Sequence, residues 1–350
     1  MCGIVGYSGP KEPLPILING LSRLEYRGYD SAGIAISDGN KITVEKKEGK
    51  LDVLKNHLKD SNIKGNIGIG HTRWATHGVP NDVNAHPHSD NSEEFAIIHN
   101  GIIENYAEIK KDLLEEGFEF KSDTDTEVVA VELSRKWNGQ LLKTVTDVAK
   151  TLEGTYALVV TTTKEEGTIV AGRLMSPLVL GVGENEVFLA SDSAAILEHT
   201  NKMIFLENGD FVEIKNGQYK LFDSELNEIE REIQEIDWEV SEAEKLGYDH
   251  FMYKEILEQS EVIERTISGR LETTSKEIPI KQDEASKYEK IWIVACGTAY
   301  HAGLFGKDLF EKVLGVPVSV ELASEFRYRE PIVGENDLGI VISQSCLLYT

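Results

Sequence analysis

The chain begins with MCGIVGYSG, residues 1–9, and this stretch places a cysteine directly before a predicted buried strand. Ile4 and Val5 predict the strand. A buried strand so close to the N-terminus is unusual, because the first residues of a chain commonly fray. If Met1 is removed, Cys2 carries a thiol and a free α-amino group on the same residue. An α-amino group has a pKa of about 7.7–8.0, so an appreciable fraction is neutral near pH 7 and can act as the general base for that thiol. The position alone leaves two interpretations open: an N-terminal nucleophile, or a small buried hydrophobic residue.

The composition limits the classes of protein that this chain can be. Its 350 residues are enough for two domains, and hydrophobic residues make up 41% of them. The 60 acidic residues outnumber the 36 basic ones, which gives a net charge of −24. This balance disfavours binding to nucleic acid or to an anionic membrane, because both need clustered lysine and arginine. There is no apolar run of about 18–20 residues, no signal-peptide pattern and no paired cysteine motif, so we expect a cytoplasmic protein.

The first part of the chain is predicted to be a layered α+β domain covering residues 2–220. Short apolar runs bounded by turn residues predict strands over 3–8, 32–37, 66–71, 95–99, 155–162, 168–171, 178–182, 187–190 and 210–214. Helical spacing of apolar residues predicts helices over 12–25, 104–116 and 125–137. Strands that come in blocks, with helices grouped between them, favour packed layers over alternating βαβ units.

The rest of the chain changes character. Residues 221–250 are strongly acidic with little strand signal, and we interpret them as a linker. Residues 251–345 begin with an amphipathic helix and continue as an alternation of strands and helices, which favours the beginning of a doubly wound α/β domain. The predicted elements are strands over 291–298, 316–321 and 338–342, a helix over 299–314, and a short helix before the last strand.

Five polar segments of the first domain concentrate residue types that carry chemistry. They are EYRGYDSAG (25–33), GHTRWATHG (70–78), NAHPH (84–88), HNGIIEN (99–105) and KSDTDTE (121–127). Each alone has an ordinary explanation, since Asn-Gly commonly forms a turn and the acids before a helix commonly cap it. The histidines raise the option of a metal site, but no cysteine lies near them and no pair has helical spacing, so we expect no metal. The histidines concerned are His71, His77, His86 and His88.

Taken together with CGIVG (2–6), these segments closely resemble the glutaminase domain of the N-terminal-nucleophile glutamine amidotransferases. The resemblance implies a four-layer αββα sandwich and a catalytic Cys2 that attacks the side-chain amide of glutamine to form a γ-glutamyl thioester. It also implies that the Asn100 side chain and the Gly101 backbone N–H form the oxyanion hole, and that Arg27 supports the nucleophile. Preset donors of this kind are worth about 3 kcal/mol each in comparable acyl-transfer sites.

The same resemblance assigns the residues that bind glutamine. Arg73 would pair with the α-carboxylate of the substrate, and Asp125 with its α-ammonium group. A zwitterionic end needs one cation and one anion, and an arginine fork fits a carboxylate selectively. The remaining residues lie in a loop that would close over glutamine and exclude water; they are Trp74, Thr76 and His77.

The second domain resembles a sugar-isomerase domain in the segments IWIVACGTAYHAG (291–303), VELASEFRYREP (320–331) and VISQS (341–345). By this resemblance the sugar phosphate would contact Thr298, Ser343, Gln344 and Ser345. Ala299 stands where many members of the family carry a serine. Neither an acidic phosphoribosyl-pyrophosphate signature nor the Ser-Gly loop of an asparagine-synthetase type is visible. The family resemblance implies transfer of ammonia from L-glutamine to fructose 6-phosphate by a homodimer, with no redox or metal cofactor.

The last residues depart from the family pattern. After Ser345 the family continues with a Gly-Glu-Thr turn, whereas this chain reads CLLYT over residues 346–350. We expect this tail to be non-native, from a gene read that was cut short, and the chain itself to hydrolyse glutamine at best. The alternative function is a non-catalytic sugar-phosphate-binding regulatory protein. That alternative predicts an intact sugar site beside a decayed glutaminase, whereas Cys2, Arg73, Asn100 and Asp125 are all in place.

Overall fold

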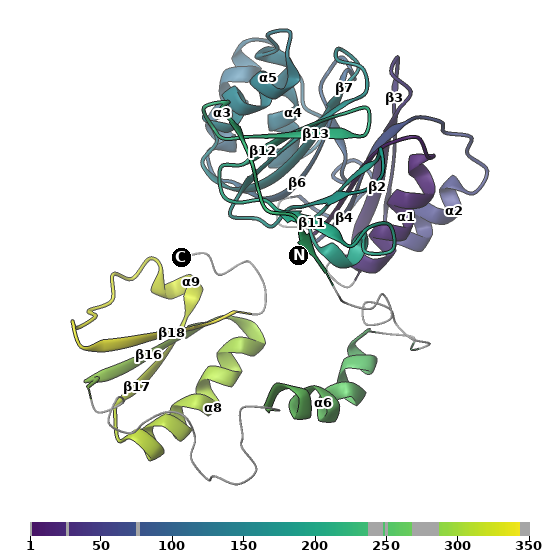
Figure 1. The fold of residues 1–350 in the computed structure, drawn as a ribbon. Coiled ribbons are helices and arrows are strands. Elements are labelled where there is room, and N and C mark those ends of the chain that lie inside the picture. Colours follow the sequence, from purple (N-terminus) through teal and green to yellow (C-terminus); the bar gives the residue numbers. More distant parts are fainter. Residues whose placement is uncertain are drawn as a thin grey trace. The chain divides into compact units, whose positions relative to one another are not determined.

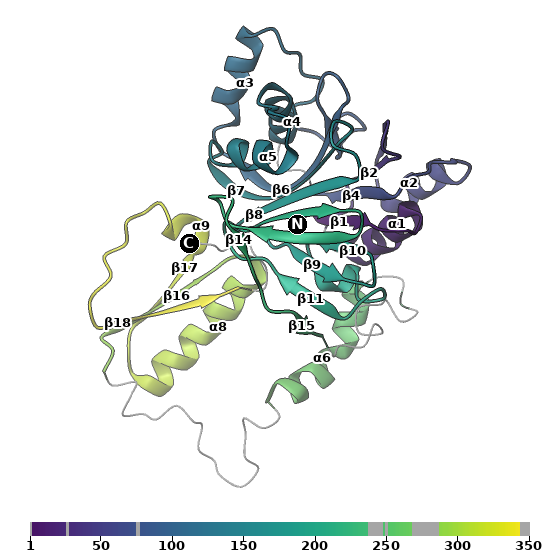
Figure 2. The same cartoon turned by 45° about the horizontal axis from the view of Figure 1, so that its top comes forward.

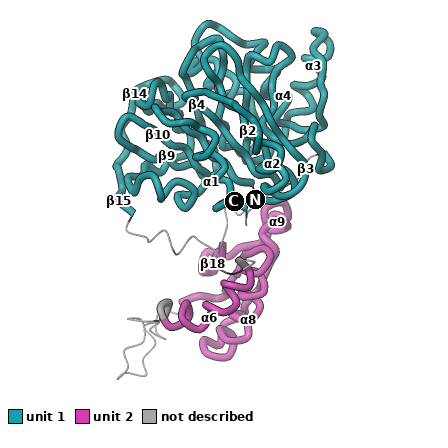
Figure 3. The backbone as a smooth tube through the Cα atoms, turned by 90° about the vertical axis from the view of Figure 1, so that its right-hand side faces the viewer, with its two compact units in different colours: residues 1–246 teal, residues 247–350 magenta. Residues whose placement is uncertain are grey.

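The computed structural model describes residues 2–25, 28–74, 78–236, 248, 251–267 and 287–343. The chain divides into two compact units, residues 1–246 and residues 247–350, drawn in teal and magenta in Figure 3.

The first unit is built on two antiparallel sheets (Figure 1). Eight described strands form the first sheet, in the order β15 (Gln234–Glu235), β11 (Lys202–Phe205), β9 (Val179–Val182), β10 (Val187–Ala190), β1 (Gly3–Ser8), β4 (Ile67–Arg73), β2 (Ser31–Ser37) and β3 (Ile42–Glu48). Seven described strands form the second sheet, in the order β14 (Glu228–Ile229), β13 (Gln218–Phe222), β12 (Phe211–Lys215), β8 (Thr168–Leu174), β7 (Gly154–Thr162), β6 (Phe95–Ile103) and β5 (His88–Ser89).

Helices cover the outer face of each sheet. The first sheet packs on α1 (Pro13–Leu24) and α2 (Leu51–Leu58), with the short 3-10 helix η2 (Ser193–Ala195) beside them. The second sheet packs on α4 (Asp125–Arg135) and α5 (Leu141–Ala149), and α3 (Tyr106–Glu115) packs on α4. Figure 2 shows the same arrangement from a second direction. This is the expected four-layer αββα sandwich, so the predicted fold class is confirmed.

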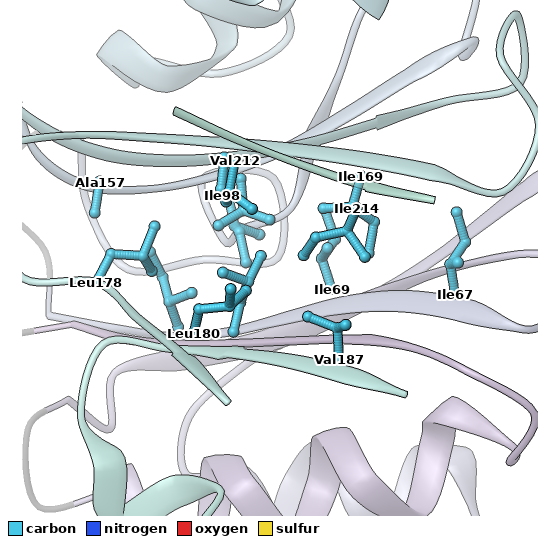
Figure 4. Close-up of a cluster of buried hydrophobic side chains, with 14 of the residues drawn as sticks. Ile67, Ile69, Ile98, Ala157, Ile169, Leu178, Leu180, Val187, Val212 and Ile214 are labelled. Atoms are coloured by element: carbon cyan, nitrogen blue, oxygen red, sulfur yellow. The ribbon is translucent and has the colours of Figure 1, made fainter. Parts of the chain in front are cut away.

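The apolar run of β1 is buried on both faces because it lies inside this sandwich. Ile4 belongs to the core between the two sheets, whereas Val5 and Tyr7 belong to the core under the first pair of helices. Successive strand residues point to opposite faces, so a strand between two layers must be apolar throughout. Figure 4 shows the core between the sheets, where side chains such as Ile69 and Ile98 meet from opposite sides.

Several elements of the first unit escaped the sequence analysis. Residues 221–250, interpreted as a linker, contain β14 and β15, which pair with β13 and β11. Each has two residues, too few to show an alternating pattern against the acidic background. The half-buried strand β3 was missed because its sequence, ITVEKKE, carries four charged residues. The other elements that were not predicted are α2, α5, β5, β11, β13 and η2.

The second unit begins with α6 (Phe251–Ile267) and continues as an alternating α/β segment. A parallel three-stranded sheet has the order β17 (Val318–Leu322), β16 (Lys290–Ala295) and β18 (Asp337–Ile342). The helix α8 (Gly297–Leu314) connects β16 to β17, and α9 (Ala323–Phe326) follows β17. The first strand of the unit, β16, has one parallel neighbour on each side. This arrangement is typical of a doubly wound sheet, as expected. Among the described residues, no helix is long and apolar enough to cross a membrane.

Candidate active site

Cys2 lies directly before β1, which is an interior strand of the first sheet between β10 and β4. Its Sγ accepts a hydrogen bond from the Trp74 backbone N–H at 3.2 Å and lies 3.6 Å from the Trp74 carbonyl oxygen. Burial raises the pKa of the Cys2 thiol, and the hydrogen bond from Trp74 only partly offsets this effect. The thiol is therefore protonated at neutral pH, and a reaction at this sulfur needs a nearby base to accept the proton.

The glycine that follows Cys2 is required by packing. A Cβ at Gly3 would lie 2.6 Å from the Thr72 Oγ1 and 2.8 Å from the Leu24 Cβ. Heavy atoms do not approach so closely, so any larger residue would push β1 away from β4 and α1. The Cys-Gly sequence thus lets the first residues pack against two neighbouring elements, which holds the cysteine in place.

Asn100 comes from the second sheet and reaches the residue before β1. Its Nδ2 donates a hydrogen bond to the Cys2 carbonyl oxygen at 3.1 Å, which joins residues 98 positions apart. Its Oδ1 lies 3.0 Å from the His71 Nε2. Asn100 and Gly101 lie within β6, so the ordinary explanation of this Asn-Gly pair as a turn is wrong.

Gly101 has a backbone conformation that other residues avoid. Its φ is +132°, and a Cβ there would lie 2.0 Å from the Thr155 carbonyl oxygen on β7. Only glycine fits this close approach of two strands. The sequence therefore places a glycine where β6 carries its Asn100 side chain toward Cys2.

Arg73 and Asp125 are charged residues buried in the same region of the first unit. Arg73 is the last residue of β4, and its Nη2 donates to the Gly78 carbonyl oxygen at 3.2 Å. Asp125 is the first residue of α4, and its Oδ2 accepts the Ile103 backbone N–H at 2.9 Å. A carboxylate in the first turn of a helix is stabilised by the N-terminal backbone N–H groups. The strand β4 and the helix α4 thus bring one cation and one anion into a buried setting.

Of the four remaining predicted residues of the glutaminase, the structure describes Trp74 alone. Trp74 follows β4, is 48% exposed, and meets the Tyr29 ring edge-on at 5.5 Å. An exposed aromatic pair beside a buried arginine and a half-buried cysteine is suited to covering a ligand. Three predicted residues lie outside the described part of the chain; they are Arg27, Thr76 and His77.

Four buried histidines lie beneath these residues: His71, His86, His88 and His99. The His71 and His86 rings stack at 4.3 Å, and His86 meets His88 edge-on at 4.7 Å. Burial lowers the pKa of His71 to about 3 and lowers the pKa values of His86 and His88 well below the usual value, so these three rings are neutral at pH 7. In the part of the chain that the structure describes, no group of three histidine, cysteine or acidic side chains is arranged to hold a metal ion.

Threonine hydroxyls connect this histidine cluster to α4. The Thr126 Oγ1 lies 2.9 Å from the His86 Nε2 and 3.0 Å from the His99 Nδ1. The His99 Nδ1 in turn lies 4.0 Å from the Asp125 Oδ2. From the sequence we considered His71, His86 and His88 only as metal ligands, which we did not expect, and this supporting role was not predicted. The available signal was their position within or beside apolar strands, which argues for buried, hydrogen-bonded rings.

In the second unit, Thr298 and Ser343 follow neighbouring parallel strands. Ala295, the last residue of β16, pairs with Ile342, the last residue of β18. Thr298 lies in the first turn of α8, and Ser343 follows β18 directly. The ends of adjacent parallel strands share one edge of the sheet, which is where α/β sheets bind ligands. Gln344 and Ser345 lie outside the described residues.

Comparison with known families identifies the class of protein. The glutamine amidotransferase domain family matches residues 56–254, and the SIS domain family matches residues 285–346. The first match covers more than half of the chain, so this chain belongs to the glutamine amidotransferase family.

Curated relatives of one name match almost the whole chain. The glutamine--fructose-6-phosphate aminotransferase [isomerizing] of Clostridium perfringens is 50% identical over 349 residues, which cover 99% of this chain and 57% of that protein. The proteins of the same name from Clostridium acetobutylicum and Aquifex aeolicus are 48% and 46% identical, with 99% of this chain covered in both and 57% and 58% of those proteins. The chain thus spans somewhat more than half the length of the curated relatives that it matches.

Solved structures support the fold. The glutamine phosphoribosylpyrophosphate amidotransferase of B. subtilis is 22% identical with a TM-score of 0.58, over 91% of this chain and 65% of that one. A structure described as the allosteric regulatory enzyme of purine biosynthesis is also 22% identical, with a TM-score of 0.59, over 98% of this chain and 68% of that one. At this identity the likeness concerns the fold alone.

Proposed function

We propose that this chain is the glutamine-hydrolysing part of an enzyme that transfers the amide nitrogen of L-glutamine to fructose 6-phosphate. The products would be glucosamine 6-phosphate and L-glutamate. The observation that carries the proposal is that Cys2 accepts a hydrogen bond from a group positioned by each sheet. The Trp74 backbone N–H donates to its sulfur, and the Asn100 side chain donates to its carbonyl oxygen. The acceptor is taken from the relatives of about 50% identity, whose name includes fructose 6-phosphate.

The first chemical step begins at Cys2 after removal of Met1. The free α-amino group accepts the thiol proton, and the thiolate attacks the side-chain amide carbon of glutamine. The carbonyl π electrons move to oxygen, and the oxyanion is held by the Asn100 Nδ2 and the Gly101 N–H. The Asn100 amide has two N–H groups, and only one is used by the Cys2 carbonyl, so the other remains for this role.

The second step collapses the tetrahedral intermediate. The C–N bond breaks while the α-ammonium group of Cys2 returns its proton to the leaving nitrogen, which departs as ammonia. A γ-glutamyl thioester remains on Cys2. Water then attacks the thioester carbon with the α-amino group again as the base, and cleavage of the C–S bond releases glutamate and restores the thiol.

Arg73 and Asp125 hold the zwitterionic end of glutamine in this proposal. The guanidinium group pairs with the α-carboxylate, and the Asp125 carboxylate pairs with the α-ammonium group. Both side chains are buried, which strengthens each charge pair relative to water. Trp74, Thr76 and His77 would form the loop that closes over the substrate, and Arg27 would support the nucleophile.

The second unit supplies the acceptor site in the same proposal. Thr298, Ser343, Gln344 and Ser345 would bind the phosphate of fructose 6-phosphate, and the strand register that brings β16 and β18 to one edge supports this placement. A homodimer and a cytoplasmic location belong to the proposal as well. The alternative, a non-catalytic sugar-phosphate-binding protein, is not favoured, because the relatives are named as aminotransferases.

Glutamate release from glutamine tests the glutaminase part of the proposal. The purified chain should hydrolyse glutamine, and Cys2→Ala should lower the rate by at least about 10³-fold while the thermal unfolding midpoint stays unchanged. Cys296→Ala is the matched control and should hydrolyse glutamine as the parent does. A processed, folded parent without glutamine hydrolysis, or a Cys2→Ala variant as active as the parent, would contradict the proposal.

A further inference from the structure

The Asn100 amide has a donor end and an acceptor end, and only one orientation suits an oxyanion. The Nδ2 carries two N–H groups, whereas the Oδ1 only accepts hydrogen bonds. A rotation of about 180° around the Cβ–Cγ bond would exchange the two ends and bring a partial negative charge toward the developing oxyanion. Catalysis by this residue therefore requires a contact that selects one orientation.

His71 makes such a contact from the opposite sheet. Its Nε2 lies 3.0 Å from the His99 carbonyl oxygen and 3.0 Å from the Asn100 Oδ1. Both neighbours are acceptors in this arrangement, so the Nε2 must carry the proton and donate to both. If the Asn100 amide were reversed, an N–H group would face the N–H group of His71 at hydrogen-bond distance, which is repulsive.

The contact of Asn100 with Cys2 favours the same orientation. The Asn100 Nδ2 donates to the Cys2 carbonyl oxygen at 3.1 Å. A reversed amide would place its oxygen against that carbonyl oxygen. The two ends of one amide are thus held by groups of opposite hydrogen-bonding type, one on β4 and one at the start of β1.

The His71 ring is itself fixed in one tautomer and one plane. It is fully buried, and within the described residues its Nδ1 has no hydrogen-bond partner, so a second proton there would be unsatisfied. Burial lowers the pKa of His71 to about 3, which keeps the ring neutral. Stacking on His86 at 4.3 Å holds the plane of the ring.

We infer that His71 is a positioning residue that fixes the orientation of the Asn100 amide so that its Nδ2 faces the reacting carbonyl oxygen. The inference rests on the proposed glutaminase function and extends it to a residue outside the set assigned above. His71 acts through Asn100 and takes no part in proton transfer. The histidine cluster then supports catalysis indirectly, because it holds the Asn100 side-chain amide, the donor of the oxyanion hole, in place.

Two variants separate the role of the Nε2 donor from the role of bulk. His71→Leu keeps a buried side chain of similar size and removes the donor, whereas His71→Gln keeps an N–H donor at a comparable distance from the backbone. We expect His71→Leu to lower kcat for glutamine hydrolysis about 10- to 100-fold with KM changed less than about threefold. His71→Gln should retain at least about a third of the parental kcat.

An aldehyde analogue of glutamine gives the decisive measurement. In L-glutamate γ-semialdehyde the Cys2 thiolate adds to the carbonyl carbon, and the resulting hemithioacetal places its oxygen where the oxyanion forms. His71→Leu should weaken the affinity for this aldehyde by the same factor as it lowers kcat, and should leave the affinity for the product glutamate unchanged. A merely structural role would weaken both ligands alike, and that result would overturn the inference.

A double variant tests whether His71 acts through Asn100. Asn100→Ala should lower kcat about 10²- to 10³-fold, and His71→Leu should add less than about twofold in that background. Multiplying effects would overturn the inference, as would a His71→Leu variant with the parental kcat. If His71→Leu does not fold, His71→Asn replaces it, because its shorter amide does not reach the Asn100 Oδ1. An inactive parental chain would instead contradict the proposed function, so the two failures are distinguishable.

Discussion

The two units of this chain place their candidate sites in different ways. In the first unit, the site draws on both sheets. Cys2 is hydrogen-bonded by the Trp74 backbone N–H, which follows a neighbouring strand, and by the Asn100 side chain, which comes from the other sheet. In the second unit, Thr298 and Ser343 are brought together only by the register of two parallel strands. A site of the first kind depends on the packing of the whole sandwich, whereas a site of the second kind depends on one sheet edge.

The two units also differ in how far the side chains near their candidate sites are buried. Several charged and polar side chains near Cys2 are buried, namely Arg73, His71 and Asn100, whereas Trp74 is exposed. In the second unit, Gly303 is the one residue of α8 that is buried, and Phe305 on this helix is 76% exposed. We therefore expect substitutions that disturb the packing around the first site to change activity and stability together, and substitutions in the second site to change ligand affinity alone.

Gly101→Ala should produce the largest combined effect. The new methyl group would lie 2.0 Å from the Thr155 carbonyl oxygen at a φ of +132°, so β6 and β7 must separate beside Asn100. We expect the free energy of unfolding to fall by about 2–4 kcal/mol, and glutamine hydrolysis to fall about 100-fold or more. Urea unfolding and glutamate release measure the two effects.

Gly139→Ala is the matched control for this prediction. Its φ is +97°, but a Cβ there meets nothing within 4 Å. The substitution should cost about 1 kcal/mol from backbone strain alone and leave activity unchanged. Equal losses of stability in the two variants would show that the close approach of β6 to β7 is not what requires glycine at residue 101.

Acid should destabilise the first unit through its buried histidines. Folding lowers the pKa values of His71, His86 and His88, so these residues bind protons more readily in the unfolded chain. Their contribution to stability is complete above about pH 6.5 and is lost as the pH falls below that value, by up to about 1.4 kcal/mol per histidine and pH unit. Urea unfolding at pH 7.5, 6.5 and 5.5 measures this slope.

His88→Gln tests the assignment of the slope to these rings. Glutamine can still hydrogen-bond the Thr124 hydroxyl, which lies 3.0 Å from the His88 Nε2. The variant should lose less stability between pH 6.5 and 5.5 than the parent, by about one histidine's share. An unchanged slope would mean that other groups cause the acid sensitivity.

Asp125→Asn should affect substrate binding more than chemistry. The carboxylate is proposed to pair with the α-ammonium group of glutamine, and an amide removes that charge while keeping the size of the side chain. We expect KM for glutamine to rise about 10- to 100-fold, with a smaller change in kcat. Asp147→Asn, at a half-buried position on α5 where the carboxylate pairs with Lys143, should change neither constant. A kcat loss at unchanged KM would contradict the proposed role.

Thr298→Val should produce the smallest effect and the most local one. Removing one hydroxyl at the start of α8 should weaken the binding of fructose 6-phosphate about 3- to 10-fold. Glutamine hydrolysis and the unfolding midpoint of the first unit should not change. Ser324→Ala, on an exposed residue of α9, is the control, and calorimetric titration with the sugar phosphate is the measurement. A loss of glutamine hydrolysis in Thr298→Val would show that the two sites do not act independently.

The sequence carries the outline of the first site because its key residues lie in local motifs. Three local features can each be recognised within a few positions: Cys2 before an apolar strand, the Asn-Gly pair at residues 100–101, and the acids at the start of α4. The layered α+β class follows from the blocks of strands and helices in the same local way. The predicted roles of these residues stay predictions until the variants above are measured.

The supporting contacts could not be predicted, because they depend on which strands become neighbours. His71 and Asn100 lie on different sheets, and nothing in either local sequence says that the histidine donates to the amide oxygen. The two-residue strands β14 and β15 are defined only by the edges they extend. Tertiary pairing, and not local propensity, decides such elements.

The central claim is that Cys2 becomes an N-terminal nucleophile within this sandwich. Intact mass before and after incubation with an electrophilic diazoketone analogue of glutamine tests it most directly. We expect loss of the initiator methionine and a single covalent adduct, which is absent in Cys2→Ala and present in Cys296→Ala. A folded chain that keeps Met1, or that takes up no label at Cys2, would show that Cys2 is not an N-terminal nucleophile.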